Sequence, residues 1–427
     1  MQKYVNPPVS EWTKLLKRPE VSTSDLYDSA NSVLEDIRRE GDKAVARYSA
    51  KYDAYTAHQF EVSADEIELA EEQLSEELKS AIRRAAANIE RFHSAQWHSK
   101  TIVETEPGVN CWQKSVPIEK VGLYVPGGTA PLFSTVLMLG IPARIAGCST
   151  IVLCSPPSSN GNINPAILFA AKLAGIKQIF RIGGIQAIGA MAFGTQTVPK
   201  VYKIFGPGNR FVTAAKQLVS LKDTAIDMPA GPSEVLIMAD DTANPAFVAA
   251  DLLSQAEHGA DSQVILLTNS PGLLDATLAE IDKQVKMLPR QAGALTALSH
   301  SRAFLLPSME EMMKMSNLYA PEHLILSVRN AAEVAENVVN AGSVFIGHYS
   351  PESAGDYASG TNHTLPTHGY ARSYSGVNLD SFLRKITFQE LSKEGLKNLG
   401  PAIELMAEAE MLQAHKNAVT IRLNSLK

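Results

Sequence analysis

Apolar residues near the start of the chain recur at the spacing of amphipathic helices. Across residues 21–98, positions such as Leu34, Ile37 and Val45 fall on one helical face, and residues 76–89 continue the pattern. Acidic and basic residues fill the positions between them. The pattern predicts helices whose apolar stripe packs on a core and whose charged faces meet water.

From about residue 121, short apolar runs alternate with helical segments. The expected strands are residues 151–154, 178–182, 201–205, 234–238, 264–267, 324–326 and 343–346. Helices are expected between them, near residues 166–171, 186–193, 210–220 and 273–287. Such alternation is typical of parallel sheets with helices on both faces, and the number of strands predicts two sheets.

The last part of the chain, from about residue 381 to residue 427, has a different pattern. Leu405, Leu412 and Val419 recur every seven residues. A helical tail with a single apolar stripe docks either on its own body or on a partner subunit. The periodicity leaves both possibilities open.

The composition is that of a globular protein with more than one domain. The chain has 427 residues, of which 45% are hydrophobic and 20% charged, enough to bury sizeable cores. A net charge of −6 argues against a nucleic-acid or anionic-membrane surface, which would need clustered lysine and arginine. The N-terminus has no apolar core like that of a signal peptide, and no run reaches the roughly 18 apolar residues that span a bilayer. A soluble cytoplasmic protein is therefore expected.

The cysteines indicate neither disulfides nor a zinc knuckle. Cys111, Cys148 and Cys154 cannot pair evenly and form no Cys-x-x-Cys motif, which suggests a reducing compartment. Cys148 and Cys154 are interpreted as small buried hydrophobes rather than nucleophiles.

A polar sequence at residues 254–259 closes an otherwise apolar helix. It puts an amide, a carboxylate and an imidazole after the apolar run at residues 247–253. Gln255 and His258 share a helical face, where buried polar groups need partners that a metal ion or a polar substrate would supply. The alternative is an exposed last turn capped by Gly259.

Polar residues further along the chain complete a candidate metal site. His258, Asp356 and His415 supply two imidazoles and a carboxylate, and Gln255 could add an amide oxygen. This mixture suits Zn²⁺ or a similar divalent ion. The residues are widely separated in sequence, so their spacing alone does not define a site.

Glu322 and His323 form the candidate acid/base pair. A histidine titrates near neutrality and can take and return protons, and an adjacent glutamate could activate water. Consecutive strand residues point to opposite faces, so the pair can serve one site only at the mouth of the strand at residues 324–326. The alternative is a structural turn after Pro321.

Glycine-containing turns follow expected strands at residues 126–129, 183–186 and 206–209. Ligands of parallel sheets bind at the carboxyl ends of strands, where such turns bring a phosphate to a helix N-terminus. None of the turns matches Gly-x-Gly-x-x-Gly or a Walker A loop. They indicate either plain turns or a dinucleotide held differently from the usual Rossmann mode.

Taken together, these segments resemble the histidinol dehydrogenases over nearly the full length of the chain. The resemblance rests on long motifs in the same order, at residues 121–128, 204–209, 227–234, 255–258, 320–323 and 355–360. It implies an α/β fold of two Rossmann-like parallel-sheet domains, similar to that of aldehyde dehydrogenases. An N-terminal helical arm and a C-terminal helical tail, swapped between subunits, would complete the fold.

The resemblance implies a division into domains. Residues 1–20 would form the N-terminal arm. Residues 21–123, together with residues 236–380, would form a first α/β domain that carries most of the catalytic site. Residues 124–235 would form a second α/β domain with the NAD-binding loops, and residues 381–427 the dimerisation tail.

The resemblance also implies a reaction and its cofactors. Members of the family oxidise L-histidinol to L-histidine through bound L-histidinal, using two NAD, in the last steps of histidine biosynthesis. Each subunit of a homodimer would hold one zinc ion. No nucleic acid or membrane is an expected partner.

The family's site residues carry over to matching positions of this sequence. The zinc ligands would be Gln255, His258, Asp356 and His415. Glu322 and His323 would be the catalytic acid/base pair. Substrate would be contacted by both sets and by Ser233, His363 and Glu410, and NAD by Tyr124, Gln186 and Asn209. In a homodimer, Glu410 and His415 would complete the neighbouring subunit's site.

The sequence departs from the family pattern at a few positions. Gly259 follows the motif histidine, where many members carry aspartate, and Met411 follows the tail glutamate, where many carry glycine. Ile185 replaces a common small residue. None of these changes removes a proposed catalytic group.

Residue types alone leave two other classes of function. A zinc hydrolase could use the same His, Asp and Glu set, but it would not need the glycine turns. A non-catalytic, metal-dependent binding protein would leave the Glu322–His323 pair without a role.

Overall fold

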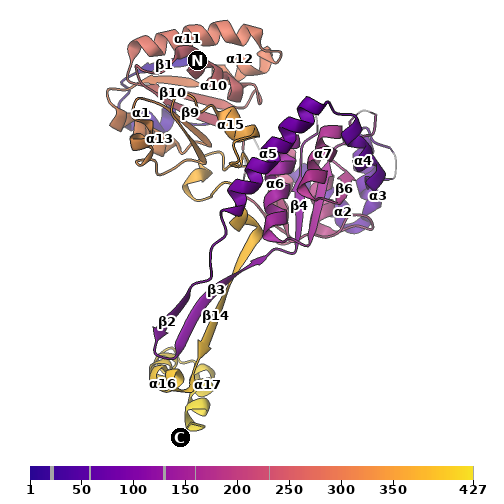
Figure 1. Cartoon of the computed structure of the whole chain (residues 1–427), viewed down its shortest axis with the longest axis vertical. Coiled ribbons are helices and arrows are strands. Elements are labelled where there is room, and N and C mark those ends of the chain that lie inside the picture. The colour runs from indigo at the N-terminus through magenta and orange to yellow at the C-terminus, as the bar shows by residue number, and fades with distance from the viewer. Residues whose placement is uncertain (20–23, 57–58, 128–130, 159, 230, 427) are drawn as a thin grey trace.

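The computed structural model describes residues 1–19, 24–56, 59–127, 131–158, 160–229 and 231–426. These residues form two α/β units and a long arm that leads to the C-terminus (Figure 1). Gly128 and Thr129 of the first glycine turn, and Ala230 of the motif at residues 227–234, lie outside the described residues.

One unit is built on a parallel sheet, named here the larger sheet. Among the described residues its strand order is β1 (Gln2–Val5), β11 (Arg302–Leu305), β10 (Gln263–Thr268), β9 (Glu234–Ala239), β12 (His323–Ser327) and β13 (Ser343–Ile346). Each neighbouring pair is parallel. Every residue of β9, β10 and β12 is buried, because helices cover both faces of the sheet.

Alternate residues of the central strand β9 enter separate cores. Val235 and Ile237 share a core with α10 (Pro245–Ala256), α11 (Pro271–Gln284), η1 (Val285–Met287) and α12 (Gln291–Ser299). Leu236 and Met238 share another with α1 (Val9–Leu15), α13 (Met309–Tyr319) and α14 (Ala331–Ala335). After β13 the chain continues through α15 (Glu352–Tyr357) and η2 (Tyr370–Arg372).

The other unit is built on a second parallel sheet, named here the smaller sheet. Its order among the described residues is β6 (Gln178–Arg181), β5 (Thr150–Ser155), β4 (Lys120–Tyr124), β7 (Lys203–Phe205) and β8 (Ala225–Ile226). One core joins it to α4 (Ala64–Glu72), α5 (Glu76–Ser94), α6 (Phe133–Ala146) and α7 (Pro165–Ala174). The other core joins it to α2 (Ser24–Glu40), α3 (Asp42–Tyr52), α8 (Gly184–Phe193) and α9 (Arg210–Ser220).

An antiparallel ribbon leads from the smaller-sheet unit to the C-terminal helices (Figure 1). It consists of β2 (Ile102–Glu106), β3 (Val109–Pro117) and β14 (Leu383–Leu391), which follows η3 (Leu379–Phe382). Beyond it, α16 (Lys393–Ala409) and α17 (Gln413–Asn424) pack on each other. Leu405, Met406 and Ile421 of these helices are 69%, 66% and 69% exposed. These side chains are left uncovered by the described residues of the chain itself.

The predicted alternation of strands and helices is confirmed, as are the parallel sheets and the helical tail. The helices expected across residues 21–98 are α2 to α5. The N-terminal arm, expected to be helical, begins instead with β1, which adds an edge strand to the larger sheet. No helix within the described ranges is long and apolar enough to cross a membrane.

The hydrophobic cores group the chain differently from the expected domain division. Residues 21–123 were expected to join residues 236–380 in one domain. The apolar faces of α2 to α5 pack instead with the smaller sheet. The reason is physical: helical periodicity identifies the face that is buried, but it carries no information about which sheet covers that face.

Candidate active site

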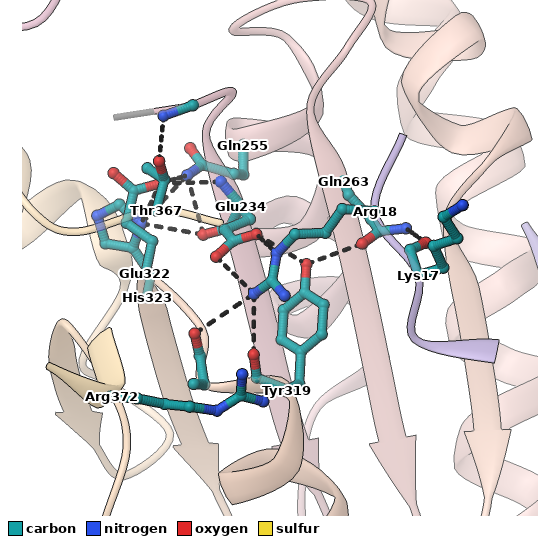
Figure 2. A network of polar contacts seen from close by, with 12 residues as sticks. Lys17, Arg18, Glu234, Gln255, Gln263, Tyr319, Glu322, His323, Thr367 and Arg372 are labelled. Carbon is teal, nitrogen blue, oxygen red and sulfur yellow. Dashed lines mark hydrogen bonds and ion pairs between the residues drawn. The ribbon is translucent and has the colours of Figure 1, made fainter. Parts of the chain in front are cut away.

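Glu322 and His323 lie at the amino end of β12 in the larger sheet (Figure 2). Both are buried, with 5% and 3% of their surfaces exposed. The Glu322 Oε2 atom accepts a hydrogen bond of 2.9 Å from the backbone N–H of Glu234. His323 Nδ1 lies 3.2 Å from the Glu234 carbonyl oxygen. The two consecutive side chains therefore meet at the amino end of β9 instead of pointing to opposite faces.

His323 Nδ1 lies between the Glu234 carbonyl oxygen at 3.2 Å and Gln255 Nε2 at 3.1 Å. A carbonyl oxygen only accepts, so in the contact with Glu234 the Nδ1 atom is the donor. Gln255 Nε2 can donate to the same carbonyl, at 3.2 Å. His323 Nε2 is buried and has no hydrogen-bond partner among the described residues, and it lies 3.7 Å from Asp356 Oδ1. In the neutral imidazole with hydrogen on Nδ1, Nε2 is the basic nitrogen, and it faces Asp356.

Candidate metal ligands gather beside His323. Ligand atoms of His258, Glu352 and Asp356 all lie within 4.8 Å of one another. Gln255 Oε1 and Glu352 Oε2 are buried and lack a hydrogen-bond partner in the part of the chain that the structure describes. Such oxygen atoms beside an imidazole would be satisfied by a divalent cation, so the residues present fit a zinc ion.

Glu352 is missing from the site that the sequence predicts. It is the first residue of α15 and only 1% exposed. Its position four residues before Asp356 places both carboxylates on one helical face, and that spacing is the signal that could have identified it.

The cluster gathers three carboxyl groups, those of Glu322, Glu352 and Asp356, around the His323 imidazole. Burial raises the pKa of Glu322 to about 8 and that of Glu352 to about 8. Burial alone would lower the pKa of His323, but the neighbouring carboxylates of Glu352, Glu322 and Asp356 raise it to about 10. Burial would raise the pKa of Asp356, yet the adjacent imidazole of His323 and those of His363 and His258 hold it below its usual value. These carboxylates together favour a cation.

Glu410 and His415 lie away from this cluster. Glu410 directly follows α16, and His415 belongs to the first turn of α17; both are exposed. These helices lie at the far end of the arm from the larger sheet (Figure 1). A single chain therefore brings together the other candidate ligands and the acid/base pair but not the two tail residues.

His363 connects the cluster to the smaller-sheet unit. Its Nδ1 atom donates to the Asp356 carbonyl oxygen at 2.9 Å, so Nε2 accepts from the Thr135 hydroxyl of α6 at 2.9 Å. Burial lowers the pKa of His363. Thr135 lies in the first turn of α6, which follows the carboxyl end of β4. His363 therefore links the Asp356 cluster to the carboxyl edge of the smaller sheet. Ser233, another expected substrate contact, is half-buried directly before β9.

The expected NAD residues lie at the carboxyl edge of the smaller sheet. Tyr124 ends β4, Gln186 lies in the first turn of α8 after β6, and Asn209 caps α9 after β7. Strands β5 and β6 lie on one side of β4, and β7 lies on the other. The sheet therefore has a topological switch point between β4 and β7, where ligands of parallel sheets bind.

The backbone at the switch point is closely packed. Gly206 has a φ of 120°, and a Cβ atom there would lie 2.0 Å from the Tyr124 carbonyl oxygen. Only glycine fits this approach. Its N–H donates to Asp227 Oδ2 at 2.8 Å and its carbonyl accepts from Lys216 Nζ at 2.7 Å, so a buried ion pair holds the turn.

The turn before α8 is held by Asp53, the residue that directly follows α3. Asp53 Oδ2 accepts from Gly183 N–H at 3.1 Å and from Gln186 Nε2 at 2.9 Å. Gln186 Oε1 is buried without a partner among the residues described. Ile185, which departs from the family pattern, is 5% exposed and packs in the core of α8 and α9. The larger side chain therefore fills a core and leaves the turn itself unobstructed.

Cys148 and Cys154 are not candidate nucleophiles. Burial raises the pKa of the Cys148 thiol to about 12 and also raises that of Cys154. Neither thiol would form an appreciable thiolate at neutral pH. Cys154 is fully buried in β5, as interpreted from the sequence, while Cys148 is half-buried.

The sequence and the fold are similar to known proteins across the whole chain. Residues 16–423 match the family described as histidinol dehydrogenase. A histidinol dehydrogenase of Bacteroides thetaiotaomicron is 61% identical over 428 residues, covering 100% of both chains. That of Escherichia coli K12 is 54% identical over 417 residues, covering 97% of this chain and 95% of the other. A crystal structure of histidinol dehydrogenase from Elizabethkingia anophelis is 59% identical, with a TM-score of 0.98 over 100% of this chain and 98% of the other.

Proposed function

The chain belongs to the histidinol dehydrogenase family of NAD-dependent oxidoreductases, and we propose that it oxidises L-histidinol to L-histidine with two NAD⁺. One observation carries the proposal. A buried histidine with a free Nε2 atom, a buried glutamate and candidate metal ligands converge at the amino edge of the larger sheet. The hydrogen bond between His363 and Thr135 links the unit that carries the proton acceptor to the unit that carries the proposed dinucleotide residues.

The proposed metal is zinc, held by Gln255, His258 and Asp356 of one subunit and by His415 of the neighbouring one. When bound, zinc would supply a Lewis acid that binds the imidazole and amino groups of the substrate and so fixes its carbinol carbon. Glu352 lies against two of these ligands and adds negative charge beside the cation.

His323 and Glu322 have distinct roles in the proposed reaction. His323 Nε2 takes the hydroxyl proton as the carbinol hydride passes to NAD⁺, which yields the aldehyde and NADH. Glu322 has Oε2 held by the Glu234 N–H and uses its other oxygen to take a proton from water. That water adds to the aldehyde, and the hydrate gives its hydride to a second NAD⁺. One histidinol, two NAD⁺ and one water become histidine, two NADH and protons.

The proposed site is completed by the tail of a second copy of the chain. The separation of Glu410 and His415 from the rest of the cluster, together with the exposed apolar surface of α16 and α17, supports a homodimer with exchanged tails. An isologous dimer contains two equivalent exchanged sites.

Exchange of tails predicts complementation between two inactive variants. Mixing His323→Asn with His415→Asn protein should restore about a quarter of the wild-type activity after full subunit exchange, because half of the dimers are mixed and each mixed dimer has one intact site. Turnover is measured before and after exchange, with each variant exchanged against itself as a control. No recovery after proven exchange would indicate that each chain uses its own His415.

The buried pair at the switch point gives a second prediction. The Lys216 Nζ to Asp227 Oδ1 distance is 2.6 Å, and the side chains are 5% and 2% exposed. Lys216→Met leaves Asp227 buried without its partner, which costs about 3–5 kcal/mol of folding stability, and releases the Gly206 carbonyl. We expect a lower melting temperature and an increase of about tenfold or more in the KM for NAD, with zinc content unchanged. The exposed Lys222→Met variant is the control. An unchanged KM for NAD in Lys216→Met would contradict a role of the Gly206 turn in binding NAD.

Substrate selectivity tests the proposed function. Purified protein with zinc and NAD⁺ should form NADH, measured at 340 nm, from L-histidinol but not from L-leucinol, which lacks the imidazole. A zinc hydrolase or a metal-dependent binding protein would form NADH from neither alcohol.

A further inference from the structure

An arginine of the N-terminal segment contacts the strand ends that carry the acid/base pair. Arg18, which follows α1, binds the Glu234 carboxylate through Nε at 2.5 Å and Nη2 at 2.9 Å. Its guanidinium lies 3.9 Å from the centre of the Tyr319 ring. The side chains of Arg18 and Glu234 are 14% and 3% exposed. Figure 2 shows the pair between β9 and the end of α13.

The same guanidinium contacts the turn that leads to Glu322. Arg18 Nη2 donates to the Tyr319 carbonyl at 2.9 Å and to the Ala320 carbonyl at 3.4 Å. Ala320 has a left-handed φ of 54°, a conformation that non-glycine residues adopt only at a cost. Arg18 thus joins the start of β9 to the strained turn two residues before Glu322.

The backbone N–H and carbonyl of Glu234 in turn contact the proposed acid/base pair, Glu322 and His323. Its N–H holds Glu322 Oε2, and its carbonyl accepts from His323 Nδ1. The carboxylate of Glu234 is held by Arg18 and by the Tyr319 hydroxyl, the latter at 3.0 Å. One residue therefore connects the Arg18 guanidinium to both members of the acid/base pair.

We propose that Arg18 is a positioning residue of the catalytic site, which acts through Glu234 to fix the orientation of Glu322 and His323. The proposal rests on the proposed function for the reaction it serves. Arginine suits the role because its planar fork binds a carboxylate through two nitrogens and stacks on an aromatic ring, which the ammonium of lysine does not reproduce. Small displacements of a catalytic group lower turnover with little effect on substrate binding.

Arg18→Lys tests the proposal in the full-length, zinc-loaded enzyme. We expect kcat to fall by about tenfold or more, with the KM for L-histidinol and for NAD changed by less than about threefold and zinc content unchanged. Arg38→Lys is the matched control, since Arg38 binds Asp223 through two nitrogens, at 3.1 and 2.7 Å, in the smaller-sheet unit. This control should keep the wild-type kcat.

A double-mutant cycle distinguishes positioning from general support of the fold. If Arg18 acts through Glu234, Arg18→Ala combined with Glu234→Gln should lower kcat no further than the more damaging single change. A purely structural arginine would lower the melting temperature and leave kcat per zinc-bearing site at the wild-type value, and that result would overturn the proposal. If Arg18→Ala does not fold, the kcat values of the single and double variants are compared with Arg18→Lys in its place.

Amide hydrogen exchange tests the role of Arg18 independently of the proposed reaction. The Glu234 N–H is buried on Glu322, so Arg18→Lys should increase its exchange rate while the amides of β10 keep theirs. This measurement needs no turnover. An active wild-type enzyme whose Arg18→Lys variant has unchanged kcat and exchange would refute the role of Arg18 alone, whereas an inactive wild-type enzyme would refute the proposed reaction.

Discussion

Replacing His323 with asparagine is expected to lower kcat by about 10²- to 10⁴-fold, the usual contribution of a general acid or base. The asparagine side chain can still donate a hydrogen bond toward the Glu234 carbonyl, which His323 Nδ1 contacts at 3.2 Å. It offers no basic nitrogen in place of Nε2. Zinc should remain bound, because His323 is not among the proposed ligands. Steady-state turnover and metal analysis of the same preparation check both expectations.

The control for this variant is another histidine of the larger-sheet unit. His348 Nδ1 contacts the Ser327 hydroxyl at 2.8 Å at the carboxyl end of β12, the opposite end from His323. His348→Asn should keep both zinc and turnover. Near-normal turnover of His323→Asn would remove His323 from the mechanism.

Replacing His258 with asparagine is expected to weaken zinc binding, and activity should be lost because the zinc is lost. His258 lies just beyond α10, and its ring belongs to the group whose ligand atoms lie within 4.8 Å of one another. Loss of a supporting residue around a metal costs about 10- to 100-fold in affinity, so loss of a ligand should cost at least as much. The zinc content after dialysis should fall together with activity, and excess zinc should restore part of both.

The same His348→Asn variant serves as the control for metal content. Full zinc occupancy in His258→Asn after dialysis would refute the assignment of His258 as a ligand. A low occupancy in both variants would mean that the loss is not specific to the proposed site.

The sequence predicts the parallel sheets well, for a clear reason. Strands such as β9 and β10 are buried along their whole length, so they are continuous apolar runs between helical segments. The apolar pattern does not predict the ribbon of β2, β3 and β14, because every residue of β2 is exposed. A strand without a buried face leaves no apolar period to detect.

The candidate site is predictable in part. The polar residues at 254–259 and the Glu322–His323 pair interrupt apolar segments, and such interruptions are visible in the sequence. The ion pair of Arg18 with Glu234 joins residues 216 positions apart, and no local pattern records that contact. The location of Glu410 and His415 likewise depends on the direction of the arm, which their helical periodicity does not encode.

One departure from the family pattern has a local explanation. Met411 has a left-handed φ of 59° and is 89% exposed. This backbone conformation favours glycine, which accounts for the glycine that many members of the family carry there. Methionine at this position adds backbone strain of about 1 kcal/mol without removing a contact of a catalytic group.

The ratio of NADH formed to L-histidinol consumed tests the central claim most directly. The purified protein should form two NADH per histidinol, lose this activity when a chelator removes its metal, and regain it when zinc is restored. A ratio of one would mean that the reaction stops at the aldehyde, and activity that persists in metal-free protein would contradict the proposed zinc centre.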